Sequence, residues 1–92
     1  MKDIHRNVRR FLILHLLQSV SQQKKRYVGL TADLRKRLKE HNAGKSPYTA
    51  KFKPWRVVVA IRFSDGQKTE AFENYLKSGS GHAFAKRHFW RA

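Results

Sequence analysis

Hydrophobic residues gather in short runs between polar and basic stretches, and three of these runs predict β-strands. Residues 11–17 form a continuous apolar run, which is typical of a strand covered on both faces, although a short helix has the same pattern. Residues 26–30 contain the β-formers Tyr27 and Val28, and the polar connection before them predicts a hairpin with the first strand. Residues 55–63 alternate, so the odd-numbered side chains of this third strand are expected on one face.

Apolar residues three and four positions apart predict a helix directly after the second strand. This helix is expected over residues 31–43, with Thr31 or Asp33 as its N-cap, because each offers an oxygen to unpaired backbone N–H groups. Gly44 is its stop signal.

The last third of the chain predicts two further helices. The first opens with a capping box at residues 64–67 and runs to about residue 77, and Gly79 ends it. Ser80 caps a short final helix over residues 81–88. The order of strand, strand, helix, strand, helix, helix predicts an α/β (α+β) fold, with a small three-stranded antiparallel sheet flanked by helices.

The length of 92 residues fits one domain, with residues 1–10 as a basic N-terminal arm and residues 11–90 as the folded part. The chain has no cysteine, which excludes a disulfide framework and a thiolate metal site and fits the reducing cytoplasm. The basic start of the chain also resembles a signal peptide, but the apolar run after it contains His15 and no small-residue cleavage site follows. That run is too short to span a membrane as a helix, so no membrane partner is expected.

The chain is strongly basic, with 21 Lys and Arg against 6 Asp and Glu and a formal net charge of +15. Such a surface attracts polyanions, so nucleic acid is the leading partner, ahead of an anionic membrane or an acidic protein. Basic and aromatic residues alternate around the second strand, the first helix and the loop after it, which predicts a surface that follows a nucleic-acid backbone and stacks on bases. Its members are Lys24, Lys25, Arg26, Lys45, Tyr48, Lys51, Lys53 and Arg56. A solvated basic face is the alternative interpretation.

Two charged residues stand on helix faces that the pattern predicts to be buried. Arg37 shares an apolar row with Leu34, Leu38 and His41, and Glu73 lies at the edge of the buried stripe of the second helix. A carboxylate there needs a cation or hydrogen-bond donors, because burying it unpaired is costly. A salt bridge with a nearby Lys or Arg is one explanation, and a polar site shared by Glu73 and Arg37 is the other.

Such a shared site would suit phosphodiester hydrolysis. Glu73 would hold one Mg²⁺ or Mn²⁺ ion, which would neutralise charge on the phosphodiester and help the departing oxygen leave. Arg37 would fork onto phosphate oxygens as negative charge builds, and a tyrosine or histidine would orient or deprotonate the attacking water. Acidic residues are too few for a two-metal site, and the 5 histidines lack the spacing of zinc ligands.

One extended pattern resembles the second half of the GIY-YIG nuclease motif. It reads Tyr-Val-Gly-Leu-Thr at 27–31, Asp-Leu at 33–34, Arg-Leu at 37–38, His-Asn-Ala-Gly-Lys at 41–45, Pro-Trp at 54–55 and Glu-Asn-Tyr-Leu-Lys-Ser-Gly at 73–79. Over roughly residues 11–90 the chain is similar to small stand-alone bacterial members of this family, and to the N-terminal nuclease domain of excision-repair nucleases. The resemblance implies a three-stranded antiparallel sheet flanked by helices and metal-dependent cleavage of DNA.

The resemblance also implies roles for individual residues. Tyr27 matches the second motif tyrosine, Arg37 the arginine that stabilises the phosphate, and Glu73 the metal ligand. Gly29 would let the backbone lie close to the site, and His41 matches a position where small members often carry histidine.

The chain departs from the family pattern at two places. His15 stands where the family has its first tyrosine, and an imidazole there can act as base or donor near neutral pH. No asparagine follows Asn74, whereas many larger members have one late in the domain. Either small members do without it, or Lys86 and His82 fill that space.

These observations favour a DNA endonuclease directed to branched, damaged or single-stranded DNA, as in DNA repair, rather than to a defined sequence. A catalytically weakened or inactive nucleic-acid-binding module of the same fold is the main alternative, because His15 replaces the first motif tyrosine. The third interpretation is a basic domain that binds RNA or an acidic protein.

Overall fold

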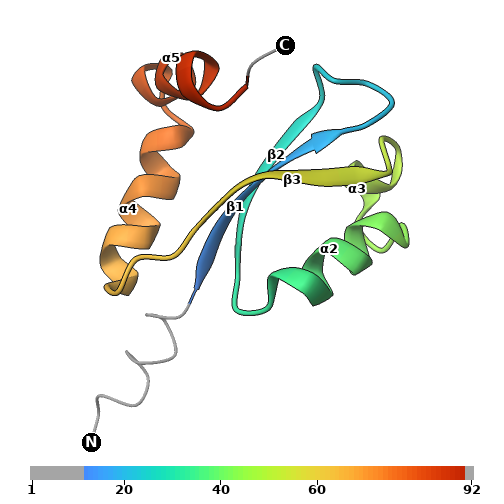
Figure 1. Ribbon diagram of the computed structural model, residues 1–92, viewed down its shortest axis with the longest axis horizontal. Helices are drawn as coiled ribbons and strands as arrows, with labels where there is room; N and C mark the ends of the chain where they lie inside the picture. Colours follow the sequence, from blue (N-terminus) through green and yellow to red (C-terminus); the bar gives the residue numbers. More distant parts are fainter. Residues whose placement is uncertain (1–11, 91–92) are drawn as a thin grey trace, which may run out of the picture.

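The fold is a three-stranded antiparallel sheet with helices on both faces, as the sequence predicts (Figure 1). The computed structural model describes residues 12–90, and the predicted arm, residues 1–10, lies outside this part of the chain. The strands β1 (Ile13–Ser19), β2 (Arg26–Thr31) and β3 (Trp55–Ile61) are arranged in the order β2-β1-β3. The helices are α2 (Leu34–Asn42), α3 (Pro47–Ala50), α4 (Gly66–Leu76) and α5 (Gly79–His88). Figure 1 shows α4 and α5 on one side of the sheet and α2 and α3 on the other.

The central strand β1 supplies side chains to both faces of the sheet. Leu14 and Leu16 join the core under α4 and α5, whereas the His15 ring lies on the α2 side, near the ring of an α2 histidine. The strand runs to Ser19, beyond the predicted apolar segment, because its polar end is satisfied by hydrogen bonds. The Ser19 hydroxyl, for example, donates to the backbone carbonyl of Phe52 at 2.7 Å.

A β-bulge in β3 breaks the alternation that the sequence predicts. Leu16 pairs with Val59 but Leu17 pairs with Val57, so Val58 is an extra residue in the ladder. Val59 therefore shares the α4 face with Leu16, and Val57 shares the α2 face with Leu17. The expectation that all odd-numbered residues of this strand share one face is wrong, because one inserted residue exchanges the two faces.

Side-chain caps set where α2 and α4 begin. Asp33, one of the two expected caps, accepts a hydrogen bond from the backbone N–H of Lys36 at 3.0 Å. At α4 the expected capping box of residues 64–67 is wrong. The cap is Asp65, which accepts from the backbone N–H of Gln67 at 2.8 Å. Its carboxylate both satisfies that donor and interacts favourably with the helix dipole.

The helix α5 begins two residues earlier than predicted. Its N-cap is Ser78 rather than Ser80, and the Ser78 hydroxyl accepts from the backbone N–H of Gly81 at 3.2 Å. Gly79, expected to end the preceding helix, is instead the first residue of α5. The loop after α2 contains the one-turn helix α3, which the sequence did not indicate and which Pro47 opens with a backbone angle suited to a first turn.

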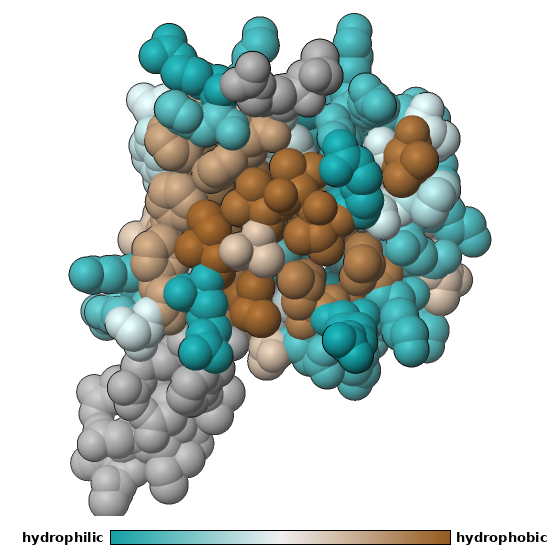
Figure 2. Space-filling model, viewed as in Figure 1, coloured by the Kyte–Doolittle hydropathy of each residue, from teal (hydrophilic) through white to brown (hydrophobic). Residues whose placement is uncertain are grey.

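The main hydrophobic core lies between the sheet and the helices α4 and α5. Its buried members are Leu14, Leu16, Leu76, Ala85 and Trp90. Partly buried hydrophobic residues of β3 and α4 pack around them, and Figure 2 shows hydrophobic surface across the middle of that view with hydrophilic side chains around it. Within residues 12–90, no helix has the length and hydrophobicity needed to cross a membrane.

Candidate active site

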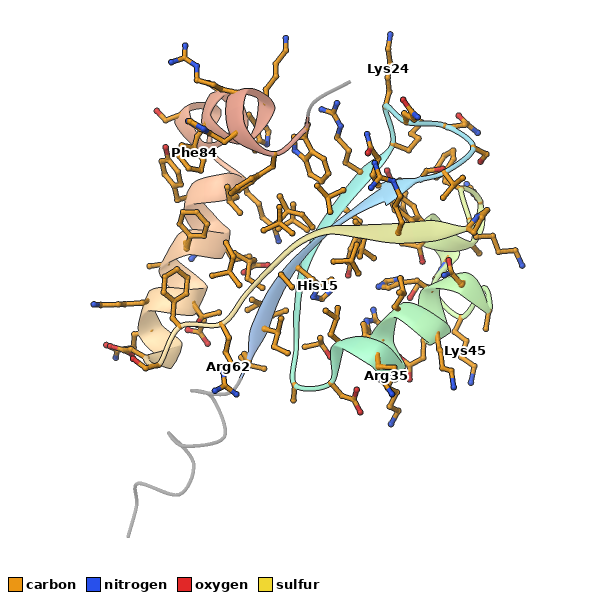
Figure 3. All side chains as sticks on the ribbon, viewed as in Figure 1. His15, Lys24, Arg35, Lys45, Arg62 and Phe84 are labelled. Carbon is orange, nitrogen blue, oxygen red and sulfur yellow. The ribbon has the colours of Figure 1, made fainter. Side chains whose placement is uncertain are left out.

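Three aromatic rings from three different elements meet on the α2 face of the sheet. His15 comes from β1, Tyr27 from β2 and His41 from α2, and Figure 3 shows His15 on the side of the sheet where α2 lies. The centroids of Tyr27 and His41 are 4.7 Å apart, and the His15 centroid lies 6.0 Å from Tyr27 and 6.5 Å from His41. Both histidines are fully buried, so this cluster forms the interior wall of the face.

Gly29 leaves the space that these rings need. It pairs with His15 across β1 and β2. A Cβ atom at this position would lie 2.8 Å from Cε2 of Tyr27 and 3.1 Å from both the Tyr27 hydroxyl oxygen and His15 Nε2. Glycine is therefore required here by the close approach of side chains to the backbone.

A hydrogen bond at Nδ1 sets the tautomer of each imidazole. His15 Nδ1 lies 3.3 Å from the backbone oxygen of Ile13, which can only accept, so we assign the proton to Nδ1. His41 Nδ1 lies 2.8 Å from the hydroxyl of Thr49, which itself donates to the backbone carbonyl of Ser46, so His41 also carries its proton on Nδ1. In the described part of the chain, neither Nε2 has a hydrogen-bond partner, although both are buried. Each ring thus offers an unpaired basic nitrogen.

Burial keeps both imidazoles in the neutral form. Desolvation is the main cause that lowers the pKa of His15, and the charge of Arg37 lowers it further, against the raising effects of the Ile13 carbonyl and of Glu73. Desolvation likewise lowers the pKa of His41 to about 4, again with a contribution from Arg37. At neutral pH both rings are therefore unprotonated at Nε2.

We expect the protein to lose stability as the pH falls from 6.5 towards about 4, because His41 is held neutral in the fold. The unfolded chain binds this proton at the ordinary pKa of 6.5, so acid favours unfolding in this window, and above it the full contribution is present. His41 alone accounts for about 2 kcal/mol of the loss between about pH 7 and about pH 5. Urea unfolding at both pH values measures it. In His41→Gln the free energy of unfolding should fall by about 2 kcal/mol less between these pH values. An equal fall in the variant and in the unchanged protein would contradict the lowered pKa of His41.

Arg37 of α2 lies beside this ring cluster and remains cationic. A hydrogen bond with the Tyr27 side chain is the main cause that raises the pKa of Arg37, and a second one with Glu40 adds to it. The guanidinium Nη1 lies 3.0 Å from the Glu40 carboxylate, and about a third of the side chain, 32 %, is exposed. Glu40 thus orients Arg37, with a longer contact of 3.5 Å from Nη2 to the Ser46 hydroxyl, while part of the charge still faces solvent.

A surface pocket of about 260 Å³ lies beside Arg37, at the start of α2. Its lining residues are Thr31, Ala32, Asp33, Lys36, Arg37 and Glu40. Lys36 and Arg37 therefore both reach this concave surface. Arg37 also interacts with the side chain of Tyr27. The carboxylates of Asp33 and Glu40 also line this pocket, so an anionic group would have to bind on the side of Lys36 and Arg37.

Glu73 of α4 stands apart from the ring cluster but acts on it electrostatically, because its charge raises the pKa of His15. Its carboxylate accepts a hydrogen bond from the Lys77 ammonium at 2.8 Å, and its side chain is 18 % exposed. Within residues 12–90, no three His, Cys, Asp or Glu side chains gather in a way that could hold a metal ion. Glu73 therefore offers a single carboxylate, without a surrounding group of protein ligands among the described residues.

Two residues that the sequence analysis did not select position the site. Thr49 of α3 is fully buried, and its hydroxyl fixes the His41 ring. Asn42, the last residue of α2, accepts from the backbone N–H of Trp55 at 2.6 Å and donates to its carbonyl at 3.2 Å, which ties α2 to β3. Pro47 before Thr49 was the available signal, since proline often opens a helical turn that can bring a short polar side chain inward.

The predicted nucleic-acid surface is divided between the two faces of the sheet. On the α3 side, the Lys25 ammonium lies 4.9 Å from the centroid of Phe52, and Tyr48 packs edge to face on the same ring at 5.3 Å. Arg26 reaches the other face, where its guanidinium lies 5.0 Å from the centroid of Trp90. The adjacent residues Lys25 and Arg26 thus lie on opposite faces of the sheet.

The remaining basic residues of that surface lie on the β1–β2 hairpin, on β3 and in the segment between α2 and β3. Arg56 donates to the side-chain oxygen of Gln18 at 2.9 Å, on the same face as Arg26. The lysines Lys24, Lys45, Lys51 and Lys53 are exposed. Figure 3 shows Lys24 at the end of the β1–β2 hairpin and Lys45 near the end of α2.

Comparison with protein families finds a match to the model described as the GIY-YIG catalytic domain, over residues 11–87 of the 92-residue chain. This match includes β1, β2 and α2, which supply the ring cluster and Arg37, as well as Glu73 of α4. Neither the curated proteins nor the solved structures contain a match to this chain.

Proposed function

The chain belongs to the GIY-YIG family of nuclease domains, and from this we propose that it is a divalent-metal-dependent DNA endonuclease with residues 11–90 as its nuclease domain. We further propose that it acts on branched, damaged or single-stranded DNA rather than on a defined sequence. Tyr27, Arg37, His15 and His41 would form the reactive centre together with Glu73.

The observation that carries this proposal is the pair of unpaired imidazole nitrogens next to Tyr27. An imidazole that acts as a general base must be unprotonated at the working pH and must have a free lone pair, and both His15 and His41 meet these conditions at Nε2. His15 Nε2 and the Tyr27 hydroxyl oxygen would each lie 3.1 Å from a Cβ at Gly29, but they form no hydrogen bond with each other, so a proton would pass from Tyr27 to this imidazole through a bridging water. The histidine at the first tyrosine position is therefore compatible with hydrolysis.

Arg37 would bind the phosphate on which this base acts. Its guanidinium is already oriented by Tyr27 and Glu40, and the pocket beside it also receives Lys36. A phosphate in that pocket would replace solvent around Arg37 and would lie next to the Tyr27 hydroxyl. The same cation would then stabilise the negative charge that builds on the phosphate oxygens during attack.

A divalent cation fits this site through Glu73. Mg²⁺ usually keeps several waters and binds through one or two carboxylates together with substrate phosphates. Glu73 would supply one such carboxylate, and within residues 12–90 it belongs to no group of three ligating side chains. When bound, Mg²⁺ or Mn²⁺ would neutralise charge on the phosphodiester and stabilise the leaving oxygen. Glu73 would have to release Lys77, and this exchange is inexpensive because the lysine is 55 % exposed.

A nicking assay on labelled forked, flapped and single-stranded DNA, with Mg²⁺ or Mn²⁺ and with EDTA as control, tests the proposal. Cleavage that needs the metal and prefers one of these structures over plain duplex is the expected result. Labelled RNA of the same sequence in parallel determines whether the substrate is DNA alone.

The second candidate function is a nucleic-acid-binding module without catalysis, which the Glu73–Lys77 ion pair favours because it occupies the proposed metal ligand. This candidate predicts binding that weakens steeply with salt and no cleavage with any divalent metal. The same assay, extended with binding measurements over a range of salt concentrations, separates the two functions.

Replacing Gly29 by alanine is expected to lower cleavage by about 10- to 100-fold with little effect on DNA binding, because the new Cβ displaces reactive atoms. That Cβ would lie 2.8 Å from the Tyr27 ring and 3.1 Å from His15 Nε2, so one of the two side chains has to move. Single-turnover cleavage and binding in EDTA measure the two effects separately. Gly79→Ala is the control, since a Cβ there meets no atom within 4 Å. Unchanged cleavage in Gly29→Ala would place the chemistry elsewhere.

A further inference from the structure

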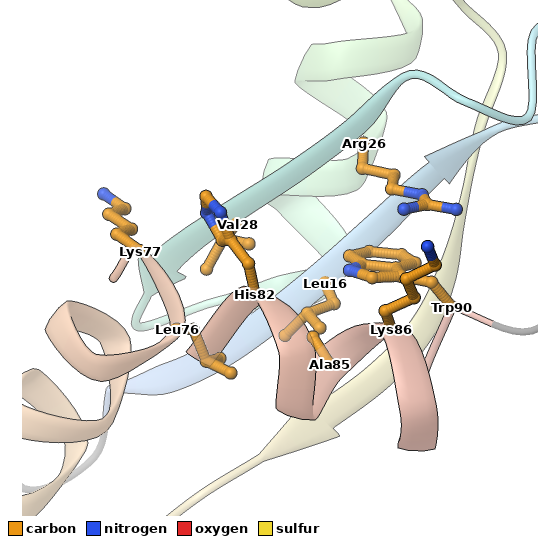
Figure 4. Close-up of a pocket in the computed structure, with 9 residues that line it drawn as sticks. All are labelled: Leu16, Arg26, Val28, Leu76, Lys77, His82, Ala85, Lys86 and Trp90. Carbon is orange, nitrogen blue, oxygen red and sulfur yellow. The ribbon is translucent and has the colours of Figure 1, made fainter. Parts of the chain in front are cut away.

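A second pocket, of about 360 Å³, lies on the opposite face of the sheet from the ring cluster, between β2 and α5 (Figure 4). Its apolar lining consists of Leu16 and Val28 from the sheet, Leu76 and Ala85 from the helices, and Trp90. Its volume is within the range of about 300–1,000 Å³ that is usual for small-molecule sites. The pocket is therefore large enough for a ligand and offers it an apolar, partly aromatic wall.

The rim of this pocket is cationic. Arg26, Lys77 and Lys86 line it together with His82, and among residues 12–90 no carboxylate does. The Arg26 guanidinium lies 5.0 Å from the Trp90 ring centroid, a distance typical of a cation–π contact. Figure 4 shows Arg26, Trp90 and Lys86 at one end of the pocket and Lys77 and His82 at the other. An aromatic and apolar wall with a basic rim matches a flat heterocycle that carries a phosphate.

The pocket and the ring cluster lie back to back on the same two strands. Leu16 pairs with Val28 on the pocket face, whereas their neighbours His15 and Tyr27 belong to the other face. Because β2 is an edge strand, a flexible nucleic-acid strand can pass around it and reach both faces. Lys77 links the two, since it lines the pocket and pairs with Glu73, whose charge acts on His15.

We propose that this pocket binds one unpaired nucleotide of a single strand, with the base against Val28, Leu16 and Trp90 and the phosphate near Lys86. This rests on the proposed function, because the nucleotide would belong to the nucleic-acid substrate. A base in a duplex is stacked and paired and cannot enter the pocket, so binding here selects DNA with an unpaired or displaced nucleotide. The pocket would thereby direct the enzyme to structure rather than to sequence.

Fluorine NMR of the full chain labelled with 5-fluorotryptophan tests this proposal in EDTA, where cleavage cannot occur. The chain has two tryptophans, so Trp55, which is buried on the α3 side, is an internal control for Trp90. A short oligothymidylate is expected to shift the Trp90 signal and to leave the Trp55 signal in place. The same oligonucleotide with abasic sites, which has equal charge and no bases, should not shift Trp90. Equal shifts with both oligonucleotides, or none with either, would overturn the proposal.

Charge reversal on α5 provides a second measurement. Lys86→Glu is expected to weaken oligothymidylate binding about tenfold, because it places a negative charge at the pocket rim. Arg87→Glu is the matched control, since it makes the same change at the next residue, which is exposed and does not line the pocket. Equal losses in both variants would mean that α5 contributes only unspecific charge.

These results are independent of cleavage. If the nicking assay shows metal-dependent cleavage but Trp90 does not respond to bases, the pocket proposal fails and the nuclease proposal stands. If Trp90 responds to bases but no metal supports cleavage, the nuclease proposal fails and the pocket remains a nucleotide site of a binding module.

Discussion

Replacing Glu73 by glutamine is expected to reduce metal-dependent DNA cleavage by at least about a thousandfold. The amide has the size and shape of the carboxylate but lacks the negative charge that a divalent cation needs from its ligand. Within residues 12–90, no group of three or more His, Cys, Asp or Glu side chains could hold the ion in its place. Single-turnover cleavage of the preferred DNA structure measures the effect, and Mn²⁺ binding followed by water proton relaxation measures the loss of the ion without reference to activity.

The stability of the protein should hardly change in this variant. The ion pair that it removes joins Glu73 to a lysine that is 55 % exposed, and pairs of this kind contribute at most about 1 kcal/mol. Glu70→Gln is the matched control, because it removes one acidic charge from the preceding turn of the same helix. If Glu73→Gln cleaves as well as Glu70→Gln, the metal is held by other groups and the site assignment is wrong.

Apart from the one-turn helix α3, the strands and helices were predictable because each has its own periodicity and end signals in the sequence. The first strand reads as an apolar run, and α2 is marked by Asp33 at its start and Gly44 at its end, where Gly44 adopts a φ of 81°. The exact starts of α4 and α5 were not predictable. Neighbouring Ser and Asp residues can each cap a helix, and only the three-dimensional course of the chain selects Asp65 and Ser78.

The β-bulge could not be predicted from the pattern of hydrophobic and polar residues. Residues 55–63 alternate well as a sequence, and nothing in that alternation indicates that Val58 leaves the ladder. The bulge arises from pairing with β1, whose two faces pack against different helix pairs. It places Trp55 on the α3 side, where its indole N–H donates to the Thr49 carbonyl at 2.7 Å, and Ile61 in the core under α4.

The candidate site was predictable in its residue types but not in its internal geometry. Tyr27 and Arg37 are close in sequence on a strand–helix unit, so their proximity follows from local structure. The contact of His15 with Gly29 depends on the register between two strands, and the hydrogen bond from His41 to Thr49 depends on a one-turn helix in a loop. The tautomers, and hence the free Nε2 atoms, follow from these non-local contacts alone.

The division of the basic residues has the same origin. Lys25 and Arg26 are adjacent in sequence, so a linear description assigns them to one surface. Successive side chains of a strand point to opposite faces, and Arg26 pairs with Gln18 on the α5 side whereas Lys25 precedes the strand and covers Phe52. One basic segment thereby places a positive charge on the face of the ring cluster and another at the pocket beside Trp90.

Replacing Gly81 by alanine is expected to destabilise the protein by about 3 kcal/mol or more, the largest stability effect of a single methyl group in this fold. Gly81 is buried in the first turn of α5, where this helix crosses the end of α4. A Cβ at Gly81 would overlap the carbonyl group of Tyr75 and would also lie 2.6 Å from Cα of Leu76. These are backbone atoms in the last turn of α4, so they cannot rotate away as a side chain could, and the two helices must separate.

Thermal unfolding followed by far-ultraviolet circular dichroism measures this effect. For a domain of this size, each kcal/mol lowers the Tm by about 4–8 °C, so a decrease of at least about 12 °C is expected. Gly79→Ala makes the same chemical change two residues earlier, where a Cβ meets no atom within 4 Å, and should leave the Tm unchanged or raise it slightly. Because Leu76 and Ala85 belong to the core and to the pocket beside Trp90, loosening this junction should also weaken oligothymidylate binding. Equal Tm values for the two variants would show that α4 and α5 are not packed this closely, and the pocket between β2 and α5 would lose its structural basis.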